Sequence, residues 1–87
     1  MIKKEFVVTV EQGLHARPAS LLVRTCRKWE CSMTLNTMEK QGNPKSILEV
    51  LSCGVKCGDK VTIAVEGKDE EEAMKSIEAL FKGNFQE

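Results

Sequence analysis

The chain has 87 residues, and its 13 basic and 13 acidic side chains leave no net charge. This length accommodates one compact domain over residues 1–87, and an apolar content of 41% argues against a disordered chain. The balanced charge excludes the basic footprint of a nucleic-acid binder, and no apolar run is long enough to cross a membrane. Because the amino terminus carries no secretory signal, we expect a cytoplasmic protein.

The first third of the sequence predicts a strand, a turn and a helix. Apolar residues alternate with more polar ones and predict a strand over residues 5–10: Phe6, Val8 and Val10. A turn at residues 13–15 follows, and from Ala16 the apolar residues recur along one helical stripe: Ala19, Leu22, Val23, Cys26 and Trp29. Pro18 lies in the first turn, where its missing N–H is not needed, so we expect the helix to begin close to His15.

The middle of the chain predicts a second strand, a turn and a short helix. Alternating residues favour a strand over residues 32–37. Residues 41–43 have the composition of a turn, which we expect to adjoin a short third strand. Ser46 and Glu49 have the capping-box spacing that opens a helix, and Gly54 indicates where this helix ends.

The last third predicts one more strand and one more helix. Residues 60–66 alternate as a strand, and Asp69 and Glu72 have the spacing of a helix N-terminus. This helix has an apolar inner stripe and ends near Gly83; the stripe is Ala73, Met74, Ile77, Leu80 and Phe81. The order β-α-β-β-α-β-α predicts an α+β fold, a two-layer open-faced sandwich with a four-stranded antiparallel sheet covered on one face by three helices.

Four cysteines raise the question of a metal site or a disulfide framework. Cys26 and Cys31 are five positions apart and Cys53 and Cys57 are four positions apart, so neither pair has C-x2-C spacing. We therefore expect buried or inactive thiols, no metal and no cofactor. The alternative, a small binding module whose cysteines hold zinc, would contain stoichiometric metal and would tolerate replacement of His15.

His15 is the only histidine, and the pattern places it just before a helix N-terminus. A lone histidine in a turn is usually a polar surface residue. However, the first turn of a helix offers unpaired N–H groups and a partial positive charge, both suited to a bound phosphate. The backbone N–H groups of Ala16 and Arg17 could face an anion on the ring, and the Arg17 guanidinium matches phosphate geometry. The sequence therefore places a nucleophile, an anion pocket and a cation within four residues.

Two motifs resemble those of a known family. Residues 13–19, Gly-Leu-His-Ala-Arg-Pro-Ala, look like the active-site motif of the histidine-containing phosphocarrier (HPr) family of the phosphoenolpyruvate-dependent sugar phosphotransferase system. Residues 43–48, Asn-Pro-Lys-Ser-Ile-Leu, are similar to the family's second signature. The glycines at 54 and 58 and the run at 67–70 also fit, so the resemblance covers effectively the whole chain.

The resemblance implies a carrier rather than an enzyme. Phosphorylated enzyme I would transfer a phosphoryl group to Nδ1 of His15, which would donate it to a histidine on an EIIA domain. Arg17 and the Ala16 N–H would stabilise the phosphoryl group in transit. Because the group moves between activated nitrogens, the protein would position it and screen its charge without supplying an acid or a base.

Ser46 has two interpretations, which are not exclusive. It is predicted as a helix N-cap with Glu49 as its partner, an arrangement worth about 1 kcal/mol. The resemblance also implies a regulatory phosphorylation site, with HPr kinase/phosphorylase as a further partner. A phosphate would be favoured at a helix N-terminus, but the Glu49 carboxylate one turn away would repel it.

The predicted second helix is apolar around most of its circumference, although packing on a sheet needs only one face. We expect the surplus to be exposed as a docking surface for enzyme I and EIIA, with these partner-binding residues: Ser20, Arg24, Arg27, Ile47, Leu48 and Leu51. A helix sunk deeply in the core is the alternative. The protein is expected to be monomeric. A paralogous carrier of a nitrogen-related or regulatory branch remains open, because it would share the His15 chemistry.

Overall fold

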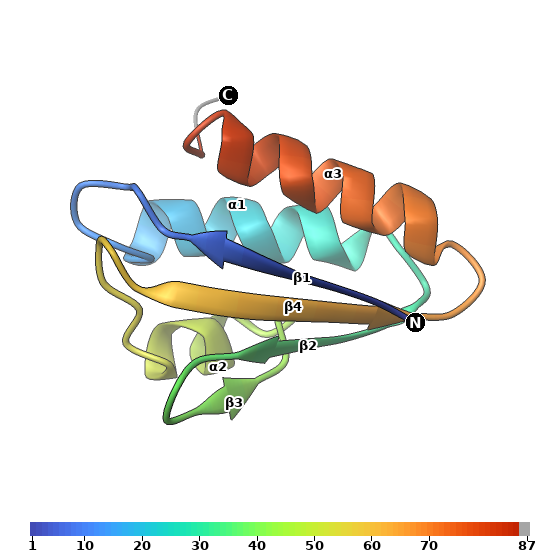
Figure 1. Ribbon diagram of the computed structural model, residues 1–87, viewed down its shortest axis with the longest axis horizontal. Helices are drawn as coiled ribbons and strands as arrows, with labels where there is room; N and C mark the ends of the chain where they lie inside the picture. The colour runs from blue at the N-terminus through green and yellow to red at the C-terminus, as the bar shows by residue number, and fades with distance from the viewer. Residues whose placement is uncertain (86–87) are drawn as a thin grey trace.

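Four strands form an antiparallel sheet in the order β1-β4-β2-β3, and three helices cover one of its faces in the computed structural model, which describes residues 1–85 (Figure 1). The strands are β1 (Ile2–Val7), β2 (Ser32–Asn36), β3 (Gln41–Gly42) and β4 (Lys60–Glu66). The helices are α1 (Ala16–Arg27), α2 (Ile47–Ser52) and α3 (Glu70–Lys82). The predicted fold class and element order are confirmed. None of these three helices has the length and apolar content needed to cross a bilayer.

The core lies between the sheet and the helices. The central strand β4 pairs with β1 on one side and β2 on the other, and alternate residues of β4 and β2 point into the core: Val61, Ile63, Val65, Met33 and Leu35. The apolar stripe predicted for the first helix packs against them, and its first four members are buried: Ala19, Leu22, Val23 and Cys26. Trp29, predicted as core, is half-buried and packs against the cluster, while its Nε1 donates to Ser76 Oγ at 2.9 Å.

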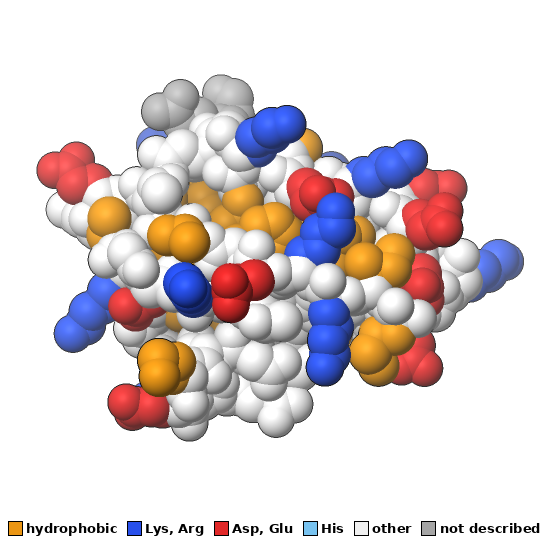
Figure 2. Space-filling view, viewed as in Figure 1, with side chains coloured by type: hydrophobic (Ala, Val, Ile, Leu, Met, Phe, Trp, Pro, Cys, Tyr) orange, Lys and Arg blue, Asp and Glu red, His pale blue; other side chains and the backbone are white. Residues whose placement is uncertain are grey.

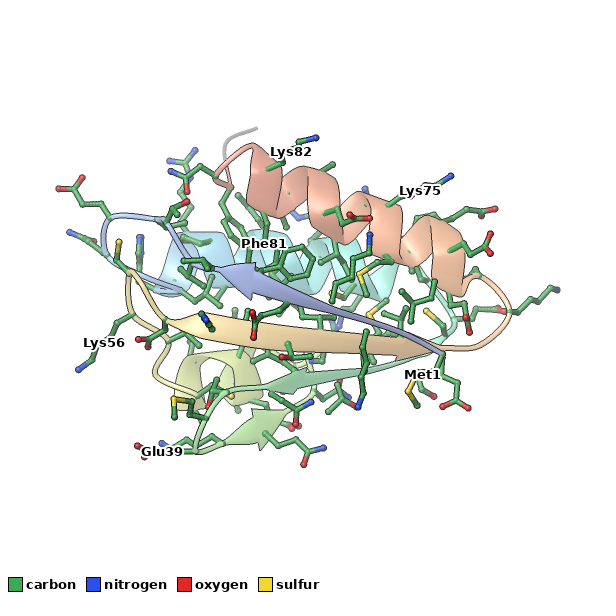
Figure 3. All side chains as sticks on the ribbon, viewed as in Figure 1. Met1, Glu39, Lys56, Lys75, Phe81 and Lys82 are labelled. Atoms are coloured by element: carbon green, nitrogen blue, oxygen red, sulfur yellow. The ribbon has the colours of Figure 1, made fainter. Side chains whose placement is uncertain are left out.

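Strand β1 starts and ends three residues earlier than expected, at Ile2–Val7 in place of 5–10. The prediction was wrong because it followed the apolar residues alone. β1 is an edge strand, so exposed charged residues fit in it, and Lys4 Nζ contacts Glu78 Oε2 of α3 at 2.7 Å. Phe6 stacks on Phe81 with ring centroids 4.3 Å apart, and Phe81 lies beside β1 in Figure 3. Val8 is fully buried but lies outside β1, where its N–H donates to Asp59 O.

The turn predicted at 41–43 lies elsewhere. Gln41 and Gly42 are themselves β3, and the chain reverses at residues 37–40, where Thr37 Oγ1 accepts from the Lys40 N–H at 2.9 Å. Gly42 has a packing role: a Cβ there would lie 3.2 Å from Cys53 Sγ and 3.2 Å from the Glu49 carbonyl oxygen. A glycine is therefore what allows α2 to pack closely on β3.

Only part of the predicted helix capping is present. Ser46 is the N-cap of α2, as expected. Asp69 occupies the N-cap position of α3 but forms no capping bond, because its carboxylate accepts from the backbone N–H groups of Glu30 and Cys31 at 2.9 and 3.0 Å. The carboxylate of Glu70, the first residue of α3, accepts from the Gly67 N–H in the preceding turn at 3.0 Å. Asp69 therefore ties the start of α3 to the connection between α1 and β2.

Candidate functional site

The connection that carries His15 is held against the connection between α2 and β4, and both lie at the same end of the molecule (Figure 1). Leu14 is buried, and its N–H donates to the Val55 carbonyl oxygen at 3.0 Å. Gly13 has φ +73, and a Cβ there would lie 2.3 Å from Val55 O and 2.7 Å from Lys56 Cα. Glycine satisfies both the left-handed backbone and the close approach. This contact fixes the backbone immediately before His15, and the resemblance of the motif gave no indication of it.

His15, Ala16 and Arg17 occupy the exposed start of α1. His15 is the N-cap residue with extended backbone, and its side chain makes no capping hydrogen bond. The N–H groups of Ala16 and Arg17 precede the point at which a helix supplies its own acceptors. Among residues 1–85, the Arg17 guanidinium forms no hydrogen bond or ion pair. Pro18, the third residue of the helix, is buried and has no N–H to satisfy. An anion on the ring would thus meet amides and a guanidinium.

Helices α1 and α2 enclose an open hollow of about 390 Å³ beside this site. We call it the α1–α2 hollow, and its lining residues are Ser20, Val23, Arg24, Arg27 and Ile47. Beyond the hollow, α2 exposes 74% of Leu48 and 40% of Leu51. Val50 is the fully buried residue of α2, so the alternative of a helix sunk deeply in the core is wrong. The residues expected to bind partners are therefore on the surface, and four of them line the hollow.

Ser46 and Glu49 do not form the reciprocal capping box. Ser46 Oγ accepts from the Glu49 N–H at 3.4 Å, a long bond. The Glu49 carboxylate turns to the preceding loop, where Oε1 accepts from the Asn43 N–H at 2.9 Å, and the Ser46 N–H donates to the Asn43 carbonyl oxygen. A carboxylate therefore already holds the backbone just before Ser46.

A cluster that the sequence did not indicate connects the end of α1 to the start of α2. Lys45 Nζ donates to the carbonyl oxygens of Trp29 and Cys31, at 2.6 and 2.8 Å. Arg27 Nε donates in return to the Lys45 carbonyl oxygen at 3.0 Å. No local pattern predicts these bonds, because the partners are 14 to 18 residues apart. The sequence could show only that a lysine precedes Ser46.

Most of the cysteines are buried, whereas His15 is exposed. Cys26, Cys31 and Cys53 are buried and Cys57 is exposed. Burial raises the pKa of Cys26 to about 12, and burial together with Asp69 raises that of Cys31 to about 11. Within residues 1–85, no group of three or more His, Cys, Asp or Glu side chains is arranged to hold a metal ion.

On the face seen in Figure 2, positive and negative side chains are interspersed, in keeping with the zero net charge.

Comparison with known protein families gives a match over nearly the whole chain. The sequence model described as "PTS HPr component phosphorylation site" matches residues 2–83.

Individual relatives agree with the family match. The phosphocarrier protein HPr of Mycoplasma capricolum is 40% identical over 77 residues, which are 88% of this chain and 86% of that protein. A crystal structure of HPr from Thermoanaerobacter tengcongensis has a TM-score of 0.95 and 38% identity, over 100% of this chain and 98% of that one. The Bacillus subtilis catabolite repression protein Crh, solved as a swapped, intertwined dimer, has a TM-score of 0.75 and 31% identity over 100% of both chains. The chain therefore belongs to the HPr family, the phosphocarriers of the phosphotransferase system.

Proposed function

We propose that residues 1–87 act as one phosphocarrier unit that accepts a phosphoryl group on Nδ1 of His15 from phosphorylated enzyme I and donates it to an EIIA domain. The observation that carries this proposal is the exposed imidazole at the N-cap of α1, with Arg17 two residues further on. The helix N-terminus favours negative charge on the ring. The Ala16 and Arg17 N–H groups and the guanidinium stabilise the phosphoryl oxygens during transfer.

The chemistry needs little else from the protein. The phosphoryl group leaves one nitrogen and joins another, so no general acid or base is required, and catalysis consists of positioning and charge screening. The clamp between Gly13 and residues 55–56 supplies the positioning, because it fixes the backbone on which the ring is carried. The carrier therefore becomes reactive only when a partner completes the in-line arrangement.

The α1–α2 hollow and the exposed side chains of α2 form the docking surface for both partners in this proposal. Arg24 and Arg27 provide positive charge, while Ile47, Leu48 and Leu51 provide apolar area. A centre of exposed apolar side chains with a charged rim is the usual composition of a transient interface. In this proposal the protein works as a cytoplasmic monomer.

Ser46 is proposed here chiefly as a structural cap. Its hydroxyl already accepts from the Glu49 N–H, and the Glu49 carboxylate lies in the same loop, held by the Asn43 N–H. A phosphate on Ser46 would meet that negative charge. Regulatory phosphorylation by an HPr kinase/phosphorylase therefore stands as a second proposal, supported only by the family's Ser46 motif.

Incubation with enzyme I and phosphoenolpyruvate tests the main proposal. We expect one added phosphate per chain, labile in acid and stable in base, as a phosphohistidine is. His15→Ala should abolish the label, and Ser46→Ala, the matched control, should retain it. Label that persists in His15→Ala would refute the assignment of the site. Supplying EIIA domains of sugar permeases and of a nitrogen-related branch in parallel separates the two possible branches by the acceptor that removes the label.

A further inference from the structure

Lys45 lies between α1 and α2, and its ammonium group is bonded to the protein backbone instead of facing solvent. Its side chain is partly buried, and its ammonium group donates to the carbonyl oxygens of Trp29 and Cys31, just past the end of α1. These two acceptors hold the ammonium group against the protein. Among residues 1–85 no carboxylate pairs with it. The ammonium therefore ties the residue before Ser46 to the connection between α1 and β2.

The backbone of the same residue fixes a docking residue. The Lys45 carbonyl oxygen accepts from Arg27 Nε at 3.0 Å. This bond engages Nε of a side chain that is otherwise exposed. Arg27 lines the α1–α2 hollow, and so does Ile47, which is two residues after Lys45 in the chain. The arginine side of the hollow is thus bonded to Lys45.

We propose that Lys45 is a positioning residue for partner docking: its anchored backbone holds Arg27 in the geometry of the α1–α2 hollow, and Lys45 does not touch the partner itself. This inference rests on the proposed docking function. A guanidinium fixed before binding loses less conformational freedom when the partner arrives, which strengthens the encounter. The role differs from that of an ordinary basic contact, because the Lys45 charge is directed inward.

A double-mutant cycle tests this role. Phosphorylation by phosphorylated enzyme I is measured for the wild type, Lys45→Met, Arg27→Met and the double variant, with KM and kcat determined separately. Lys45→Met should raise KM by about two- to fivefold, the range of an exposed charge interaction, and should leave kcat nearly unchanged. The double variant should have the KM of Arg27→Met alone, because Lys45 acts through Arg27. Lys4→Met, which removes a bonded ammonium at β1 instead, should leave KM unchanged.

A second variant and a readout that needs no partner separate positioning from stability. Lys45→Gln keeps a donor without the charge and serves if Lys45→Met does not fold. In both variants the NMR signal of the Arg27 Nε–H should lose its protection from solvent exchange, and this measurement does not depend on any partner. An unchanged KM, or a double variant whose KM rise is the product of the two single effects, would overturn the proposal. Protection retained at Arg27 would overturn it too. A wild-type chain that takes up no phosphate would instead count against the proposed function.

Discussion

Replacement of Gly13 by alanine tests the clamp beneath His15. An alanine at φ +73 costs about 1 to 2 kcal/mol of backbone strain. The new Cβ would also lie 2.3 Å from the Val55 carbonyl oxygen, so the two connections must separate. Overpacking of this kind typically costs about 1 to 3 kcal/mol. We expect Gly13→Ala to lose both amounts and to displace His15.

Gly54→Ala is the matched control. Gly54 has φ +61, but a Cβ there meets nothing within 4 Å, so it carries the backbone strain alone. The excess loss at Gly13, about 2 kcal/mol, corresponds to a Tm roughly 8 to 16 °C lower for a domain of this size. Thermal unfolding followed by circular dichroism measures the difference, and phosphate uptake from enzyme I should fall in Gly13→Ala only. Equal Tm values for the two variants would refute the clamp.

Two further predictions concern acid and thiol chemistry. The N–H groups of Glu30 and Cys31 lower the pKa of Asp69. The ionised carboxylate therefore stabilises the fold fully above the pKa that Asp69 has in the unfolded chain, and this stabilisation is lost as pH falls through the folded value. Asp69→Asn should make the free energy of unfolding fall less steeply in acid, and an unchanged slope would contradict this. A thiol reagent at neutral pH should modify the exposed Cys57 rapidly and the three buried cysteines only after unfolding. Burial keeps these thiols from the reagent and also raises the pKa of Cys26 to about 12. More than one fast adduct in the mass spectrum of the native protein would be the opposing result.

The elements with strong periodicity could be read from the sequence. β4 begins and ends where the alternation predicts, and α1 begins where the stripe predicts, because their burial is decided by their own residues. Trp29, the last member of the stripe, lies two residues beyond the end of α1. The placement of His15 and Arg17 at the start of α1 could be predicted equally well, because it depends on neighbours in the chain. The strand and turn errors came from residues whose surroundings decide their role. Gly42 has the composition of a turn residue, but it serves the approach of α2 to β3.

Contacts between distant segments could not be predicted in the same way. Asp69 has the spacing of a cap residue, yet its carboxylate is taken by the backbone of Glu30 and Cys31. Lys45 shows the same limit, because its acceptors are carbonyl groups, which every residue has. A bond to a backbone group does not depend on the residue type of the partner, so the sequence does not indicate it. Only coordinates distinguish such a lysine from one that faces solvent.

The contact of Gly13 with residues 55–56 also bears on how the two connections can change over evolutionary time. They are some forty positions apart in sequence, yet neither can gain or lose a residue without shifting the surface on which the other rests. An insertion after α2 would move the imidazole as surely as one before it. We therefore expect the lengths of these two stretches to change only together.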